Sequence, residues 1–166
     1  QILFSLLESR FETLEKIYVL VRRKKHISAK DRITAILGSS SAPAFIQENK
    51  DAVQSKIKVI DAQHLLNPGI FLEKKPIHYF IHSAGFVNLY INPDSKNEIF
   101  KENLVITQDI FEAYTDYLSK FIYISTAYSI GKLDGLLNNN YVDTEQSDYR
   151  NYYEASKHAA EKYLVK

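Results

Sequence analysis

The sequence predicts an α/β fold: a Rossmann-like doubly wound parallel sheet with helices on both faces, present here in incomplete form. Short apolar runs of strand length recur along the chain, and many of their residues are β-branched. Stretches with helical periodicity separate these runs. Strands that alternate with helices form parallel sheets, because right-handed crossovers place the helices over the sheet faces. Ligands of such sheets bind beyond the carboxyl ends of the strands, so the polar residues after each strand are the first site candidates.

The first elements are a helix and a strand. Residues 1–10 carry apolar side chains at helical spacing with no capping signal before them, so the chain is expected to begin inside a helix. Residues 16–21 (K-I-Y-V-L-V) form a compact apolar run that is typical of a buried parallel strand. The basic run R-R-K-K at 22–25 follows and predicts a loop.

A capping pattern and two further strands come next. Ser28 and Asp31 have the spacing of a capping box, and the helix that they begin is expected to end at Gly38. Residues 56–61 (K-I-K-V-I-D) and 77–83 (I-H-Y-F-I-H-S) read as strands that end in polar side chains.

The last part of the chain repeats the alternation. Residues 97–118 are long enough for one helix, and 121–124 form a short apolar strand. A loop rich in glycine and asparagine follows at 131–140, and the segment 149–166 is expected to be helical. These elements together predict one domain over residues 1–166.

Composition and charge exclude several classes of protein. The chain has 166 residues, of which 45% are hydrophobic and 25% charged, which are ordinary values for a globular domain. Its net charge of +1 provides no general field for nucleic acid or an acidic membrane. It has no cysteine, and its five histidines lack metal-ligand spacing, so no metal site is expected. No apolar stretch approaches the roughly 20 residues of a membrane span, and no signal peptide is evident, so a soluble, cytoplasmic protein is expected.

Tyr153 and Lys157 are the first pair with chemical meaning. Four residues apart in an expected helix, they lie on one face, within reach of a shared ligand. A neighbouring ammonium favours the phenolate, so a tyrosine placed in this way can exchange protons nearer neutral pH. The spacing alone fits an exposed helical pair equally well. Its weight rises because the strand at 121–124 leads into Ser125 and Thr126, which place hydroxyls at a strand end.

This order resembles the extended short-chain dehydrogenase/reductase family, in which a strand ending in a Ser or Thr hydroxyl precedes Y-x-x-x-K. The specific stretches are F-I-Y-I-S-T-A-Y-S-I-G at 121–131 and Y-Y-E-A-S-K-H-A-A-E at 152–161. I-H-S-A-G at 81–85 resembles the family's fourth-strand cofactor motif, and N-L-V-I-T at 103–107 resembles its N-V-x-G-T helix, with Ile106 where that motif has glycine. Asp61 resembles the family's adenine-contacting acid.

Within the family, the chain is most similar to fatty acyl-CoA reductases and thioester-reductase domains of the male-sterility type. I-Y-V-L-V-R-R-K-K at 17–25 resembles their second strand and basic turn, and A-G-F-V-N-L at 84–89 resembles their A-A-x-V-N segment. Arginine after this strand accommodates the 2′-phosphate of NADPH, whereas NAD sites usually offer an acid. Arg22 and Arg23 therefore favour NADPH over NADH, and a solvated basic turn is the alternative.

The resemblance implies a role for each candidate. Thr126 would hydrogen-bond the developing oxyanion, Tyr153 would supply the proton, and Lys157 would hold the nicotinamide ribose. Ser125 could instead be a simple strand-end hydrogen-bonding residue, and His82 and His158 are expected to pack or to face solvent. The expected cofactor-binding residues are Arg22, Arg23, Asp61, Ser83, Ala84, Gly85, Asn103, Ser125, Tyr153 and Lys157.

The resemblance implies an NADPH-dependent reductase of an acyl thioester or derived aldehyde, whose substrate is a small molecule or is bound to an acyl or peptidyl carrier domain. A nucleotide-sugar epimerase or dehydratase uses the same three residues and is one alternative. A non-catalytic dinucleotide-binding relative is another, because a fold alone does not prove activity. The family's glycine-rich turn and first strand are expected before Gln1, and its substrate region after Lys166.

Overall fold

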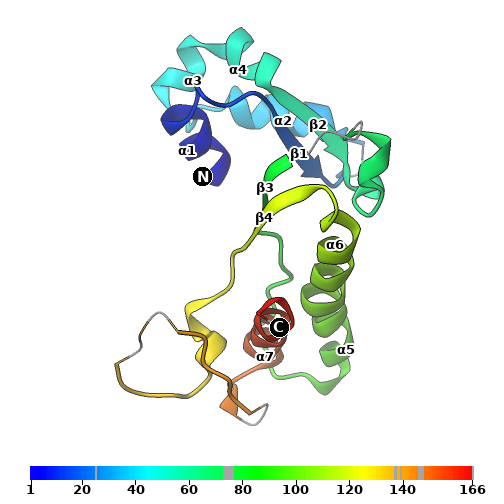
Figure 1. The fold of residues 1–166 in the computed structure, drawn as a ribbon, viewed down its shortest axis with the longest axis vertical. Coiled ribbons are helices and arrows are strands. Elements are labelled where there is room, and N and C mark those ends of the chain that lie inside the picture. Colours follow the sequence, from blue (N-terminus) through cyan, green and yellow to red (C-terminus); the bar gives the residue numbers. More distant parts are fainter. Residues whose placement is uncertain (25, 73–76, 137, 139, 146–147, 166) are drawn as a thin grey trace. The chain divides into compact units, whose positions relative to one another are not determined.

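A computed structural model describes residues 1–24, 26–72, 77–136, 138, 140–145 and 148–165. The chain forms two compact units, Gln1–Leu65 and Leu66–Lys166, and each is described by itself. Figure 1 shows the elements of both. Each unit contains a pair of parallel strands together with helices, which confirms the predicted α/β class.

The first unit pairs strands β1 and β2 in parallel. Their register places Val21, the last residue of β1, opposite Asp61, the last residue of β2. The polar residues that follow both strands therefore leave the sheet at the same edge. The elements of this unit are α1 (Ile2–Ser9), β1 (Ile17–Val21), α2 (Ala29–Leu37), α3 (Ala44–Glu48), α4 (Lys50–Lys56), β2 (Ile57–Asp61) and the 3-10 turn η1 (Ala62–His64).

The core of this unit lies between the strands and helices α1 to α4. Alternate residues of both strands, Val19 and Val59 among them, face it, as the two-residue period of a strand requires. Each large aliphatic side chain buried here contributes about 1.5–3 kcal/mol of transfer free energy. The buried members of the cluster are Leu7, Ile33, Leu37, Ala42, Ile46 and Val53.

The predicted start of α2 is confirmed. The Asp31 amide donates to Ser28 Oγ over 3.1 Å, and the Ser28 hydroxyl donates to Asp31 Oδ2 over 2.7 Å. One side chain thus satisfies an amide that the helix cannot pair by itself. The helix ends before Gly38, also as predicted.

The second unit pairs strands β3 and β4, again in parallel. His82 at the end of β3 lies opposite Tyr123 at the end of β4. Helices α5 and α6 are joined by a π-helical segment, η4. Helix α7 contacts all three segments, and Figure 1 shows it beside them. The elements are η2 (Pro68–Ile70), β3 (Ile77–His82), η3 (Pro93–Ser95), α5 (Lys96–Phe100), η4 (Lys101–Val105), α6 (Ile106–Tyr114), β4 (Leu118–Tyr123), η5 (Ala127–Ile130) and α7 (Tyr152–Leu164).

Aromatic side chains join the helices of this unit to its strands. Phe80 of β3 and Phe121 of β4 stack with their ring centroids 5.3 Å apart, and Tyr114 of α6 meets Phe80 edge-on at 4.6 Å. Phe111 of α6 contacts Phe121 of β4 and also Tyr163 of α7. Such pairs contribute about 0.5–1.5 kcal/mol each beyond the area they bury. Strands β3 and β4 are therefore held against α6.

Several predicted boundaries were wrong. The helix expected over 97–118 ends at Tyr114, because Leu118 pairs with Ile77 as the first residue of β4. Lys56 ends α4 instead of beginning a strand, and Ser83 and Ile124 lie just beyond the strands predicted to contain them. Helix α7 begins at Tyr152, after residues 149–151. Lys25 of the basic run and Lys166 lie outside the described residues.

Candidate functional site

The strand ends of the first unit bring Arg23 and Asp61 together. The Arg23 guanidinium donates from Nε to the Asp61 carboxylate, with which it forms an ion pair. The Arg23 hydrogen bond, with a second from the Gln63 amide, holds the pKa of the Asp61 carboxyl below its usual value. Because the Arg23 side chain is still 64% exposed, it keeps N–H groups for a further acceptor. Two residues expected to contact different parts of a dinucleotide are thus partners of each other.

Arg22 precedes Arg23 in the chain, and its backbone carbonyl group makes a separate contact. The Arg22 carbonyl oxygen accepts a hydrogen bond from Nη1 of Arg32 on α2. This bond ties the basic turn after β1 to the first helix that follows it.

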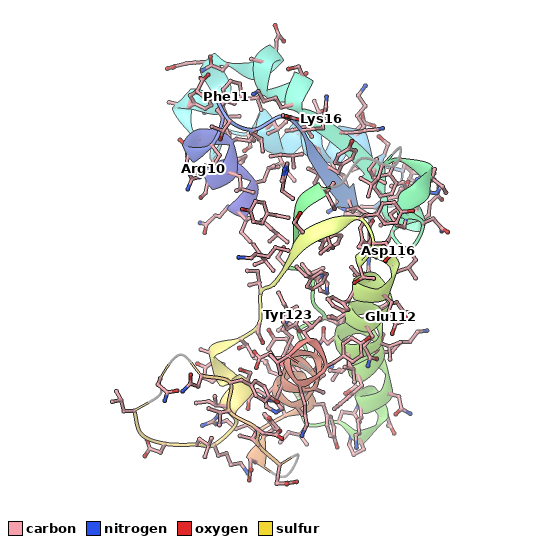
Figure 2. All side chains as sticks on the ribbon, viewed as in Figure 1. Arg10, Phe11, Lys16, Glu112, Asp116 and Tyr123 are labelled. Carbon is pink, nitrogen blue, oxygen red and sulfur yellow. The ribbon has the colours of Figure 1, made fainter. Side chains whose placement is uncertain are left out.

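The strand ends of the second unit surround Lys157 of α7. Its ammonium donates to the carbonyl oxygen of Ile124 over 2.9 Å and lies 4.1 Å from the ring centroid of Tyr123, which Figure 2 labels at the end of β4. The residue is only 3% exposed. Burial lowers the pKa of Lys157 to about 8, an effect that the Glu161 carboxylate opposes. A buried ammonium at a strand end is suited to bind a hydroxyl or an anionic oxygen.

Gly85 reaches this same place from β3. A Cβ atom on Gly85 would lie 3.8 Å from Lys157 Nζ and 3.4 Å from Asn103 Oδ1. The predicted residues Gly85, Asn103 and Lys157 therefore meet in one spot. Ser83 and Ala84 occupy the two positions between β3 and Gly85.

Asn103 uses its side chain within the protein. Its Oδ1 accepts from the Phe86 amide over 2.7 Å, and its Nδ2 donates to the Phe86 carbonyl oxygen at 3.0 Å and to Ser156 Oγ at 2.9 Å. It is 2% exposed. These bonds connect η4, the loop after β3 and α7.

Tyr153 and Thr126 are the other two residues that were predicted to be catalytic. Tyr153 is half-buried in the first turn of α7, one helical turn before Lys157. Thr126 Oγ1 accepts from the Tyr128 amide over 3.3 Å, so its own proton remains available to a ligand. Among the described residues, the Thr126 hydroxyl, the Tyr153 phenol and the Lys157 ammonium make no hydrogen bond with one another.

A dinucleotide fits these residues on two further observations. Ser125 Oγ is buried and has no hydrogen-bond partner within the described part of the chain, so it can take one from a ligand. Gly85 leaves open the volume that a side chain would occupy next to Lys157. The residues at the ends of β3 and β4 therefore suit a bound cofactor better than a closed core.

Three polar residues of this region were not predicted to have a role. Thr107 and Ser156 are 1% and 0% exposed, and His82 is 4% exposed. His82 Nε2 lies 2.9 Å from Thr107 Oγ1, and the Thr107 hydroxyl donates to the Asn103 carbonyl oxygen over 2.7 Å. Two of them could have been found from the sequence by their positions. Ser156 directly precedes Lys157, and Thr107 follows Asn103 by one helical turn.

His158 packs as expected, but it also has a carboxylate neighbour that its sequence spacing did not indicate. Its Nε2 lies 3.1 Å from Tyr141 Oη and 3.5 Å from Asp143 Oδ1. Lys162 pairs with the same carboxylate at 2.7 Å. These contacts attach the loop before α7 to the outer turns of that helix.

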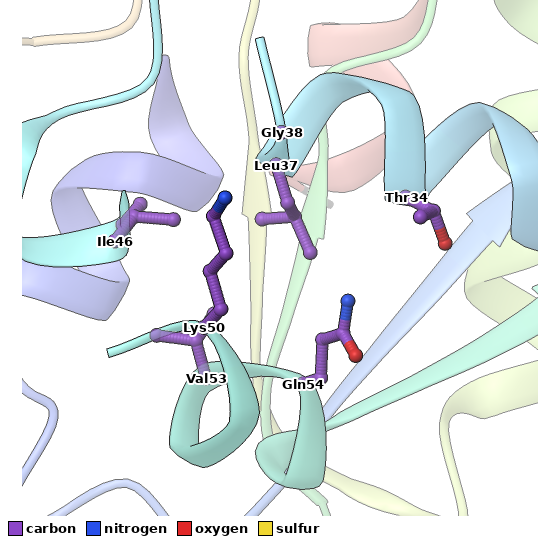
Figure 3. Close-up of a pocket in the computed structure, with 7 residues that line it drawn as sticks. All are labelled: Thr34, Leu37, Gly38, Ile46, Lys50, Val53 and Gln54. Carbon is purple, nitrogen blue, oxygen red and sulfur yellow. The ribbon is translucent and has the colours of Figure 1, made fainter. Parts of the chain in front are cut away.

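A separate cavity of about 160 Å³ lies in the first unit between α2, α3 and α4. Figure 3 shows Lys50 between Ile46 and Leu37, with Thr34 and Gln54 beside them. None of the residues predicted for the site line it. In the described ranges, no helix is long and apolar enough to cross a membrane. The same residues contain no cluster of three or more histidine, aspartate or glutamate side chains that could hold a metal ion.

Comparisons with known proteins identify a family and a fold. The model of an NAD-binding family described as Male sterility protein matches residues 1–166. Two solved structures from Burkholderia multivorans, described as a short-chain alcohol dehydrogenase and as a short-chain dehydrogenase/reductase with bound NADP, superpose with TM-scores of 0.61. Both are 11% identical over 96% of this chain, which covers 67% and 64% of their lengths.

A third solved structure, described as gox2253, has a TM-score of 0.56 and 19% identity over 98% of the chain, which covers 42% of its length. No curated protein matched the chain. At these identities the structures show the fold alone, and they confirm the predicted Rossmann-like class. The chain spans about two thirds of the length of these structures or less.

Proposed function

Because the chain belongs to the Male sterility protein family of NAD(P)-dependent oxidoreductases, of the short-chain dehydrogenase/reductase type, we propose that it supplies the catalytic residues of an NADPH-dependent acyl-thioester reductase. The position of Lys157 carries this proposal. Its ammonium is buried at the end of β4, one helical turn from Tyr153 and against the strand that leads to Thr126. This arrangement suits proton-coupled reduction of a carbonyl group.

Each of the three side chains has a defined task in this proposal. The Thr126 hydroxyl donates to the substrate carbonyl oxygen, where negative charge develops. The Tyr153 phenol delivers a proton to that oxygen as the carbonyl carbon becomes tetrahedral. The Lys157 ammonium holds a ribose hydroxyl, and its charge favours the phenolate that Tyr153 becomes after proton transfer. NADPH, when bound, supplies the hydride.

The remaining polar groups would hold the cofactor. Arg23 offers exposed guanidinium N–H groups to a 2′-phosphate, and its ion pair with Asp61 fixes where they point. Ser125 Oγ and the space at Gly85 would receive groups near the nicotinamide end. The cofactor would also lie near Arg22, which adjoins Arg23 in the sequence, and near Ser83 and Ala84, which precede Gly85. The arginines after β1 are the basis for proposing NADPH in preference to NADH.

The substrate is proposed as an acyl thioester, carried either by coenzyme A or by an acyl or peptidyl carrier domain. Reduction of a thioester by one hydride and one proton gives an aldehyde and a free thiol. An assay with the full-length protein should therefore show one aldehyde and one thiol released for each NADPH oxidised.

A nucleotide-sugar epimerase would behave differently, because it regenerates its cofactor in each cycle. Tightly retained NAD with no net NADPH oxidation would contradict the reductase proposal. Cofactor binding without turnover of acyl thioesters or their aldehydes would contradict it too, and would favour a non-catalytic dinucleotide-binding protein.

A further inference from the structure

Four buried polar residues form one continuous chain of hydrogen bonds from β3 to the catalytic helix. His82 Nε2 contacts Thr107 Oγ1 at 2.9 Å, and Thr107 donates to the Asn103 carbonyl oxygen at 2.7 Å. The Asn103 side chain donates to Ser156 Oγ at 2.9 Å, and Ser156 donates to the Tyr153 carbonyl oxygen at 2.8 Å. We term this group the brace; each of its members is 4% exposed or less. The brace consists of His82, Thr107, Asn103 and Ser156.

The protons of the brace can be placed from its connectivity. Thr107 has one hydroxyl proton, and the carbonyl oxygen of Asn103 can only accept, so that proton is used there. Thr107 Oγ1 must then accept from His82, which requires a proton on the Nε2 atom of that ring. Burial, helped by the nearby Lys157 ammonium, lowers the pKa of His82 to about 4, which agrees with a neutral ring at pH 7.

The brace joins the parts of the protein that must be held in register for the reaction. His82 ends β3, Asn103 holds both backbone polar groups of Phe86 in the following loop, and Ser156 lies beside Lys157 on α7. Asn103 sits in the π-helical segment, where an extra residue in the turn is a common feature of functional sites. A buried network with every member bonded restricts its residues to one arrangement.

We propose that the brace positions Tyr153 and Lys157 against the ends of β3 and β4, with His82 acting as an Nε2–H donor to Thr107. These four are positioning residues, because they act through Tyr153 and Lys157. The inference gives Asn103 a positioning role in place of the cofactor contact expected from the sequence. It rests on the proposed reductase function only for its kinetic consequence.

The first test measures the proton itself and needs no activity. Nitrogen-15 NMR of the full-length protein at pH 7 should find His82 neutral, protonated at Nε2, and slow to exchange that proton with water. A ring protonated at Nδ1, or a rapidly exchanging Nε2 proton, would overturn the brace whether or not the protein is a reductase.

The second test is kinetic and uses matched variants. His82→Phe keeps a ring among Phe80, Phe121 and Tyr123 but removes the donor, whereas His82→Gln keeps an N–H group near the Nε2 position. His82→Phe and Ser156→Ala should each lower kcat by about tenfold through misplacement of the catalytic groups, with little change in the KM for NADPH. His82→Gln should restore most of the loss.

Coupling separates positioning from a general loss of stability. The double variant His82→Phe with Ser156→Ala should lose about as much kcat as the worse single variant, because both interrupt one chain. Ile110→Val, which trims a residue of α6 that is 2% exposed, is the control for core destabilisation and should leave kcat unchanged. Additive losses, or losses equal to those of the control, would overturn the proposal. A wild-type protein that oxidises no NADPH would contradict the reductase function, and the NMR result would still decide on the brace.

Discussion

At the scale of the residue, buried ionisable groups define the chemistry of the second unit. The His82 ring is buried at the end of β3, and the Lys157 ammonium is buried next to the end of β4. Burial lowers the pKa of both groups, to about 8 for Lys157 and about 4 for His82. At pH 7 Lys157 is therefore still mostly charged, one helical turn from Tyr153, the proposed proton donor.

The lowered pKa of His82 makes a prediction about acid stability. In the unfolded chain this ring titrates near 6.5, and in the folded protein near 4. Between these values the unfolded state binds more protons, so the unfolding free energy falls as the pH is lowered through this window. We expect His82 to account for a loss on the order of 2 kcal/mol. Urea unfolding of wild type and His82→Gln from pH 7 to 4 measures it, and parallel curves would contradict it.

Arg23 makes a prediction about cofactor preference. Removing its charge with Arg23→Gln should raise the KM for NADPH by about tenfold and leave the KM for NADH nearly unchanged, because only NADPH has a 2′-phosphate. Arg10→Gln removes an exposed arginine of the same unit that directly follows α1, and it is the control. Equal effects of Arg23→Gln on both cofactors would show that Arg23 does not contact the 2′-phosphate.

At the scale of the element, α7 depends on its first turn. The Glu154 amide donates to Asn151 Oδ1 over 2.9 Å, and the Glu154 carboxylate accepts from the Arg150 amide over 3.1 Å. This reciprocal cap satisfies groups at the helix start, next to Tyr153. Tyr153, the proposed proton donor, therefore lies in the turn of the helix that would fray without this cap.

Asn151→Ala should therefore lower the unfolding free energy by about 1 kcal/mol and reduce kcat as well. Asn151→Ser keeps a capping oxygen and should restore both quantities. Chemical denaturation and steady-state kinetics on the same preparations measure the two effects. If the alanine variant loses stability but not kcat, the cap has no part in placing Tyr153.

The elements that could be predicted were those with a strong local signal. The apolar runs of β1 and β3 and the Ser28–Asp31 cap are written into a few adjacent residues. Helices α3 and α4 went unpredicted, because they have 5 and 7 residues and neither begins with a side-chain cap. The π-helical segment η4 was also missed, since one extra residue in a turn does not change the hydrophobic pattern enough to reveal it.

The site followed the same rule. Thr126, Tyr153 and Lys157 were chosen from a motif, whereas the ion pair of Arg23 with Asp61 depends on which strand residues lie opposite each other. The contact of His82 with Thr107 likewise joins a strand to a helix 25 residues away. A sequence motif can identify the functional residues, but their contact partners are determined by the tertiary structure.

At the scale of the whole molecule, alternation of strands and helices was enough to predict the fold class. The likeness to short-chain dehydrogenase/reductase structures confirms it. The division into Gln1–Leu65 and Leu66–Lys166 was not predicted, since two leucines at the boundary give no compositional signal. The family match over residues 1–166 makes oxidoreductase chemistry the central claim of this account.

The most direct measurement is a comparison of two adjacent tyrosines in the full-length protein. Tyr153→Phe removes the proposed proton donor, and Tyr152→Phe removes a neighbouring hydroxyl but keeps the ring over which the Lys96 ammonium lies. With an acyl thioester and NADPH, Tyr153→Phe should oxidise NADPH at least about a hundredfold more slowly than wild type, since general acid catalysis contributes at least that factor. Tyr152→Phe should match wild type. Equal rates for Tyr153→Phe and wild type would contradict the assignment of Tyr153 as the proton donor.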